Sequence, residues 1–147
     1  ETLNAGRIGI AALALGIAEG ALARALEHIT RRKQFDKRLA DFQAIQFMVA
    51  DATTGIEHAR LMLHHACCLR DQGKEFAKEA AMAKLFSSEM AMRVTYDAIQ
   101  MYGGYGFIRE YEVERYFRDA KLCTIGEGTN EIQRLIIARR VLKEFGN

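Results

Sequence analysis

The chain has 147 residues, the length of a single domain. Twenty-one Lys and Arg against nineteen Asp and Glu leave a formal charge of +2, which gives no electrostatic reason to expect a nucleic acid or an acidic partner. Hydrophobic residues make up 50% of the chain, enough for a core. There is no proline, which excludes proline-rich linkers and favours long uninterrupted helices.

The cysteines and histidines predict neither a disulfide nor a metal site. Cys67 and Cys68 are adjacent and point to different faces of a helix, and no C-x-x-C spacing includes Cys123. We interpret all three as reduced packing residues in a cytosol-like compartment. No histidine stands at the Glu-x-x-His spacing typical of metal sites in helical bundles.

The uncharged run Ile8–Ala18 is similar to the core of a signal peptide. It is shorter than the roughly 20 residues needed to span a bilayer. Helical periodicity also continues beyond it through Glu19, Arg24 and Glu27. We therefore expect a buried helix and no membrane span.

The spacing of apolar residues predicts an all-α protein without strands. The first helix, from about Leu3 to Arg32, is apolar almost all round, which is typical of the centre of a bundle. Lys33–Ala40 is expected to be a loop, and Asp41 to cap a second helix that runs to about Gln72 and ends at Gly73. Along that helix apolar residues alternate in steps of four and three, a seam for antiparallel packing: Ile45, Val49, Ala52, Ile56, Ala59, Leu63 and Ala66.

A third helix is predicted over about Ala77–Met101, and it should stop at the glycine-rich run Gly103–Gly106. A short helix over about Glu112–Ala120 follows. Thr129 or Asn130 is expected to cap the last helix, with Gln133 completing a capping box. These elements predict an up-down four-helix bundle of long helices.

Glu127 lies between two glycines, immediately before the capped last helix. Glycines let the backbone approach a ligand closely, and a helix N-terminus offers free N–H groups to an anion. A second interpretation is an ordinary loop in which Glu127 complements the helix dipole. A dinucleotide-binding fingerprint is excluded, because Glu131 stands where its third glycine is required and no strand precedes the loop.

Four runs strongly resemble the acyl-CoA dehydrogenase family, with the short-chain, butyryl-CoA-like branch the most similar. They are RRKQFDKRLADFQAIQFMVAD (31–51), AIQMYGGYGF (98–107), RYFRDAK (115–121) and TIGEGTNEIQRLIIARRVL (124–142). They follow the order of the family over nearly the whole chain. The resemblance implies that residues 1–147 form the C-terminal helical domain, a four-helix bundle, and that this is a fragment without the family's N-terminal helical and middle β-domains.

The resemblance implies an FAD-dependent oxidoreductase of fatty acid β-oxidation. Glu127 would remove a Cα proton while hydride passes from Cβ to the flavin, giving a trans-2-enoyl-CoA, and its backbone N–H would donate to the thioester oxygen. Acyl-CoA is the implied substrate, electron-transfer flavoprotein the implied partner, and a homotetramer the implied assembly. The isolated fragment should be inactive. The expected location is the bacterial cytoplasm or the mitochondrial matrix.

The remaining site residues are also implied by the resemblance. The expected substrate contacts are Asn4, Arg7 and Gly128. FAD contacts are expected at the start of the last helix, from Thr129, Asn130 and Glu131. The FAD of a neighbouring subunit is expected to contact Arg32, Gln43, Gln100, Met101, Tyr102, Gly103 and Gly104. No metal is implied.

Three positions depart from the family pattern. Asp36 stands where the family usually has glycine, although Asp tolerates left-handed backbone. Gly126 replaces a frequent aromatic residue, and Asn4 replaces an acidic one. The open alternatives are an acyl-CoA oxidase-like or dehydratase-like relative of the same fold, and a non-catalytic helical oligomerisation module. The intact Glu127 loop favours an enzyme.

Overall fold

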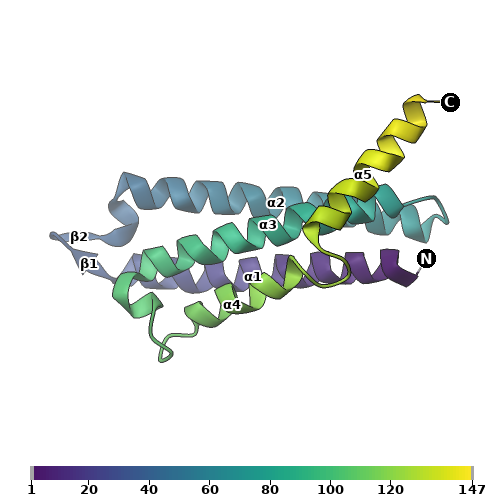
Figure 1. Cartoon of the computed structure of the whole chain (residues 1–147). Helices are drawn as coiled ribbons and strands as arrows, with labels where there is room; N and C mark the ends of the chain where they lie inside the picture. The colour runs from purple at the N-terminus through teal and green to yellow at the C-terminus, as the bar shows by residue number, and fades with distance from the viewer. Residues whose placement is uncertain (1, 147) are drawn as a thin grey trace.

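The computed structural model describes residues 2–146, and it is almost entirely helical. The five α-helices are α1 (Thr2–Arg31), α2 (Gln43–Asp71), α3 (Ala77–Tyr102), α4 (Val113–Cys123) and α5 (Asn130–Phe145). Helices α1 to α4 run alternately up and down, and α5 leaves the bundle at an angle (Figure 1). The predicted all-α, up-down four-helix bundle is confirmed.

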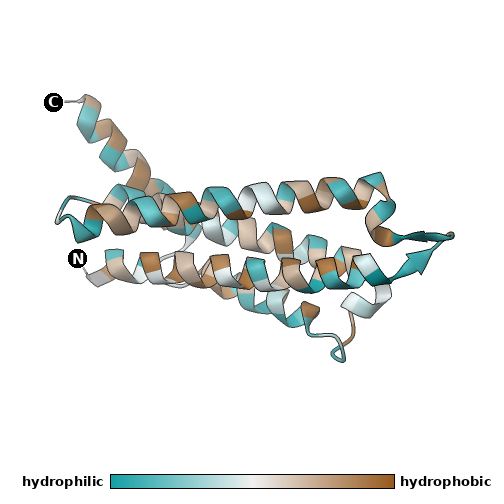
Figure 2. Ribbon diagram, turned by 180° about the vertical axis from the view of Figure 1, so that it is seen from behind, coloured by the Kyte–Doolittle hydropathy of each residue, from teal (hydrophilic) through white to brown (hydrophobic). Residues whose placement is uncertain are grey.

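A small hairpin corrects the expectation that there are no strands. Strands β1 (Lys33–Gln34) and β2 (Lys37–Arg38) pair antiparallel and are joined by Phe35 and Asp36. Both linking residues have positive φ, +53° and +60°, as the favoured two-residue hairpin turn requires. Asp36 thus adopts the left-handed backbone expected of the glycine it replaces. The hairpin projects from one end of the bundle and is hydrophilic (Figure 2).

The end of α2 follows the prediction, but its start does not. Gly73 has φ +68°, and its N–H donates to the carbonyl of Arg70 while Lys74 N–H donates to Leu69, the glycine-terminated cap of a Schellman motif. The prediction that Asp41 caps this helix was wrong. Helix α2 begins only at Gln43, because the Asp41 carboxylate instead accepts hydrogen bonds within the preceding 3-10 turn η1 (Leu39–Asp41) from Arg38.

The centre of the bundle is α3, rather than the first helix as expected. Helix α3 packs against α1, α2, α4 and α5, and small residues such as Ala80, Ala91 and Thr95 are fully buried along it. The α2 seam is confirmed from Ala52 to Ala66, while its first two members, Ile45 and Val49, are only partly buried. Small side chains allow the helices to approach one another closely.

Helix α1 has a buried face and an apolar outer face. Ala11, Ala14 and Ala18 have no exposed surface, whereas Leu3 and Leu13 are 61% and 46% exposed. By length and composition alone this helix could cross a membrane. Its buried alanines pack into the bundle, which makes it a core helix of this domain. Among the described residues, nothing covers the exposed apolar residues on the other side of α1.

Candidate functional site

The segment that joins α4 to α5 forms a tight loop close to the N-terminal half of α1 (Figure 1). The backbone N–H of Asn130 donates to the carbonyl of Thr124 at 3.1 Å and closes the loop. Glu127 and Gly128 both have positive φ, +56° and +91°. A glutamate in this region is uncommon, and such backbone persists only where the surrounding structure holds it.

The Glu127 carboxylate lies directly on the backbone of α1 at Gly6. A Cβ atom added to Gly6 would lie 2.5 Å from both Cδ and Oε2 of Glu127. The absence of a side chain at Gly6 is therefore what leaves room for the carboxylate. Among residues 2–146, the backbone N–H of Glu127 has no acceptor, so it is free to donate to a ligand oxygen.

Arg7 is buried beside Glu127. Its guanidinium Nη1 donates to Asn4 Oδ1 at 2.6 Å, while its Nε has no partner among the described residues. Burial lowers the pKa of Arg7, and the nearby Glu127 carboxylate opposes this shift. Asn4 is a suitable acceptor for Arg7, because its amide oxygen can accept from the guanidinium without adding a second carboxylate next to Glu127.

Asn4 and Arg7 line a cavity of about 470 Å³ whose other charged residues are all basic. Helix α5 supplies them: Arg139, Arg140 and Lys143. Arg140 also pairs with Glu75 at 3.5 Å, outside the cavity lining. The cavity is therefore suited to an anion. These three basic residues were not predicted, although their one-turn spacing at the end of the last helix was a usable signal.

The start of α5 is held from beneath by buried polar side chains. Thr129 is the N-cap residue, as predicted, but the capping box was wrong. Gln133 instead donates from Nε2 to the carbonyls of Gly128 at 2.9 Å and Glu127 at 3.3 Å. The amide reaches back under the loop because Gly128 has no Cβ, which would lie 2.9 Å from it.

Two further residues at the start of α5 were expected to contact FAD. Asn130 is buried, and its Oδ1 accepts from Lys84 and Ser88 on α3, so its side chain faces the bundle. Glu131 is exposed, and its backbone N–H and the Thr129 hydroxyl hold the pKa of its carboxyl below the usual range. Of these residues, Thr129 and Glu131 are the ones whose side chains are accessible to a ligand.

A second cluster forms where α1 and α3 end. A cavity of about 320 Å³ is lined by Arg32 together with all five predicted residues from Gln100 to Gly104. His28 stacks on Tyr102 with ring centroids 4.1 Å apart, and the Arg32 guanidinium lies 5.5 Å from the centre of the Tyr105 ring. Gln43 is exposed and lies outside the lining, two residues before Ile45, which belongs to it.

The two clusters lie at opposite ends of α1. Arg7 and Arg32 are 25 positions apart, which corresponds to about 37 Å along a helix. Residues of one chain at the two ends are thus too far apart to contact the same reacting group.

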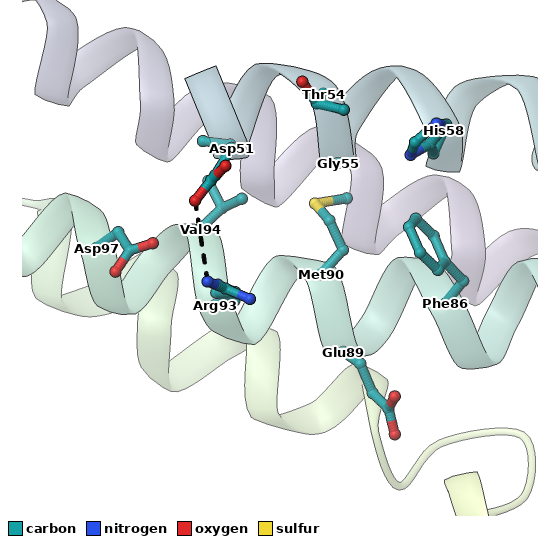
Figure 3. A pocket seen from close by; sticks show the side chains of 11 residues that line it. Asp51, Thr54, Gly55, His58, Phe86, Glu89, Met90, Arg93, Val94 and Asp97 are labelled. Atoms are coloured by element: carbon teal, nitrogen blue, oxygen red, sulfur yellow. Dashed lines mark ion pairs between the residues drawn. The ribbon is translucent and has the colours of Figure 1, made fainter. Parts of the chain in front are cut away.

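A cavity larger than either of these, about 580 Å³, lies elsewhere. It is a groove between α2 and α3 in which Asp51 and Arg93 form an ion pair at 4.0 Å (Figure 3). Burial raises the pKa of Asp97 in the same groove. None of the predicted site residues lines it, so cavity size alone would not have found the candidate site.

Two residues that shape the Glu127 loop were not predicted. Gly6 stands inside the run Asn4–Arg7, but only its contact with a residue 121 positions later reveals its role. Lys84 is fully buried and donates to the Gly128 carbonyl. A signal for it was present, because this lysine stands in an otherwise small and apolar stretch of α3.

Fold and site together define a helical domain that presents a carboxylate on a glycine loop, next to a cationic cavity and remote from a second, aromatic one. The family model described as "Acyl-CoA dehydrogenase, C-terminal domain" matches residues 1–142. The chain therefore belongs to the acyl-CoA dehydrogenase family.

Similar proteins cover almost all of the chain, but the chain spans little more than a third of their length. "Probable acyl-CoA dehydrogenase YngJ" of Bacillus subtilis is 56% identical over 97% of this chain and 37% of its own. The "Caffeyl-CoA reductase-Etf complex subunit CarC" of Acetobacterium woodii is 46% identical over 98% and 38%. The structure of butyryl-CoA dehydrogenase from Megasphaera elsdenii matches with a TM-score of 0.95 and 50% identity, over 96% and 37%.

Proposed function

We propose that this chain is the C-terminal, base-bearing domain of an FAD-dependent acyl-CoA dehydrogenase whose other domains lie outside it. The observation that carries the proposal is the Glu127 carboxylate, which a strained glycine loop presents over the bare backbone of Gly6. The similarity to short-chain acyl-CoA dehydrogenases supports this assignment.

Glu127 acts as the general base. Its carboxylate takes the proton from Cα of the acyl group, and its free backbone N–H donates to the thioester oxygen, where negative charge develops. A bound flavin supplies the acceptor for the hydride that leaves Cβ, so that the product is a trans-2-enoyl-CoA. The basic cavity near Asn4 and Arg7 offers partners to the phosphates of coenzyme A.

The residues of the second cluster suit the adenosine and pyrophosphate end of FAD. The Arg32 guanidinium can pair with phosphate oxygens, and the tyrosine and histidine rings offer stacking surfaces. Gly103 has φ +61° and open space around it, so the backbone there can approach a ligand. Because this cluster lies at the opposite end of α1 from the Glu127 loop, we assign it to the FAD of a neighbouring subunit in a homotetramer.

The redox partner is part of the same proposal. CarC is named as a subunit of a complex of a reductase with an electron-transfer flavoprotein, which supports electron-transfer flavoprotein as the partner here. An oxidase-like relative would instead pass electrons to oxygen. The enzyme is reduced anaerobically and then mixed either with electron-transfer flavoprotein or with oxygen. The faster reoxidation separates a dehydrogenase from an oxidase. We place the enzyme in the bacterial cytoplasm, or in the mitochondrial matrix of a eukaryote.

The experiment that tests the proposed function replaces Glu127 by glutamine in the full-length enzyme. The amide keeps the shape of the side chain but cannot accept the proton, so turnover of a short-chain acyl-CoA should fall by at least ~10²-fold. Flavin absorbance should stay at the wild-type level. Glu110→Gln, at an exposed position away from the loop, serves as the control. More than a tenth of wild-type turnover in Glu127→Gln would assign the base to another residue.

A further inference from the structure

Lys84 is a fully buried lysine beneath the Glu127 loop. Its ammonium group donates to the carbonyl of Gly128 and to Oδ1 of Asn130, each at 2.8 Å. Both acceptors are neutral. Within the part of the chain that the structure describes, no carboxylate lies within ion-pair distance of this ammonium.

Burying a lysine costs more free energy than burying an apolar side chain of the same size. Removing an ammonium group from water costs far more than burying a methylene chain, and two neutral acceptors return only part of that cost. A methionine of the same length would pack at position 84 without this penalty. The lysine therefore contributes something other than the stability of the core, and its contacts show where.

Both of its acceptors come shortly after Glu127 in the chain: one is the backbone carbonyl of Gly128, and the other is the side chain of Asn130, the first residue of α5. The Gly128 carbonyl also receives Gln133 Nε2 at 2.9 Å, and Asn130 Oδ1 also receives the Ser88 hydroxyl at 3.1 Å. With the bond from Gln133 Nε2 to the Glu127 carbonyl, the loop and the first residue of α5 thus receive five hydrogen bonds from below, at and directly after the strained residue Glu127. Of the donors, only Lys84 contacts both the loop carbonyl and the first residue of α5.

We propose that Lys84 is a positioning residue for the catalytic base, an inference that rests on the proposed function. By tying the Gly128 carbonyl to Asn130, its ammonium fixes the backbone at Glu127. The carboxylate then stays over Gly6, at the place where it meets the Cα proton. Lys84 itself is buried on α3 and does not touch the substrate. Its effect is on the geometry of proton transfer, not on binding.

The test compares Lys84→Met with wild type in the full-length enzyme. A misplacement of the base by about 1 Å costs on the order of 10²-fold in rate, so kcat per bound flavin should fall by about that factor. KM for the acyl-CoA should stay within about threefold, because uniform binding is unaffected. The isotope effect with Cα-deuterated substrate should rise, since proton abstraction becomes slower.

The matched control is Lys78→Met, on the same helix. Lys78 also bonds a residue of α5, Glu144, at 2.7 Å, but far from the loop. Lys78→Met should keep wild-type kcat. A purely structural role for Lys84 would lower Tm and flavin content and leave kcat per bound flavin unchanged, and that result would overturn the proposal.

A second variant and a structure keep the test decisive. Lys84→Gln retains an amide donor without charge and should show a smaller loss of kcat than Lys84→Met. If neither variant folds, Lys84 is a structural residue and the proposal is wrong. If the wild-type enzyme does not dehydrogenate acyl-CoA, the proposed function fails. A crystal structure of Lys84→Met still decides the positioning role, since Glu127 displaced from Gly6 supports it and an unmoved loop overturns it.

Discussion

Gly6 is the residue on which the position of Glu127 depends most directly. We expect Gly6→Ala to lower kcat by about 10- to 100-fold, because the added methyl group would lie 2.5 Å from the carboxylate and displace it from its site. The measurement is steady-state turnover per bound flavin in the full-length enzyme.

Gly9→Ala is the control for that substitution. It lies one turn further along α1 and has no heavy atom within 4 Å of the new Cβ. Alanine is favoured over glycine within a helix, so Gly9→Ala should keep kcat and raise stability by about 0.5–1 kcal/mol. Equal kcat in both variants would show that the Glu127 carboxylate does not need the space at Gly6.

His28 gives the domain a pH-dependent stability. Burial, with the nearby Arg32 charge in second place, lowers the pKa of His28 from its ordinary value of 6.5. The unfolded chain then binds the proton more tightly than the folded one. The contribution is fully present above about pH 6.5 and is lost as the pH falls through the lowered folded-state pKa.

We therefore predict a fall in the free energy of unfolding between pH 7.5 and 5.5 that is smaller in His28→Gln. Urea denaturation of the chain at both pH values measures it. Because other groups titrate in the same range, only the difference between the two proteins tests His28. Parallel pH profiles would mean that His28 is as easily protonated in the folded state as in the unfolded one.

At the scale of elements, α1 and α3 set the separation of the two clusters. Helix α1 carries Arg7 near its start, and Arg32 follows directly after its end, so the rigid helix fixes the distance between them. Glycine termination of α3 at Gly103 places the run from Gln100 to Gly104 beside Arg32. The long uninterrupted helices of a proline-free chain are what make this spacing constant.

Arg32→Ala should weaken flavin retention and leave chemistry intact. The guanidinium is the charged group of the second cluster and is remote from Glu127, so its loss should release FAD on dialysis while kcat per bound flavin stays near wild type. Arg70→Ala, an exposed arginine at the far end of α2, is the matched control. Full flavin content of the dialysed Arg32 variant would contradict the assignment of this cluster.

At the scale of the whole molecule, apolar side chains are exposed in two places. Exposed apolar residues line the outer side of α1, and the far end of α5 carries Leu142 and Phe145 at 70% and 86% exposure (Figures 1 and 2). Such surface usually marks a covered interface in the complete protein. It agrees with the proposal that other domains and neighbouring subunits pack here.

The isolated chain should therefore fold as a helical bundle, fail to retain FAD and self-associate. Its buried seams supply a core, whereas the flavin site that we propose takes residues from two subunits and from another domain. Analytical ultracentrifugation with a flavin absorbance scan measures both properties. A monomer carrying stoichiometric FAD would show that the site is self-contained.

The sequence alone determined the helices and the chemistry of the loop. Periodic apolar positions and glycine breaks are local signals, so the C-terminal ends of α2 and α3 could be predicted. The glycines around Glu127 likewise marked a carboxylate placed by the backbone. The prediction failed at Asp41, where two local interactions compete. Its carboxylate accepts hydrogen bonds from Arg38 instead of capping α2.

Only the tertiary structure decided what surrounds Glu127. Gly6, Lys84 and Gln133 come together from three helices. The contacts of Gly6 and Lys84 with the loop span 121 and 44 positions, so they leave no periodic trace in the sequence. The central place of α3 was also decided by packing, since small residues let it approach four neighbours, whereas the more apolar α1 keeps one face outside. Hydrophobicity predicts that a helix is buried, but the shape of the neighbouring helices determines which of its sides is buried.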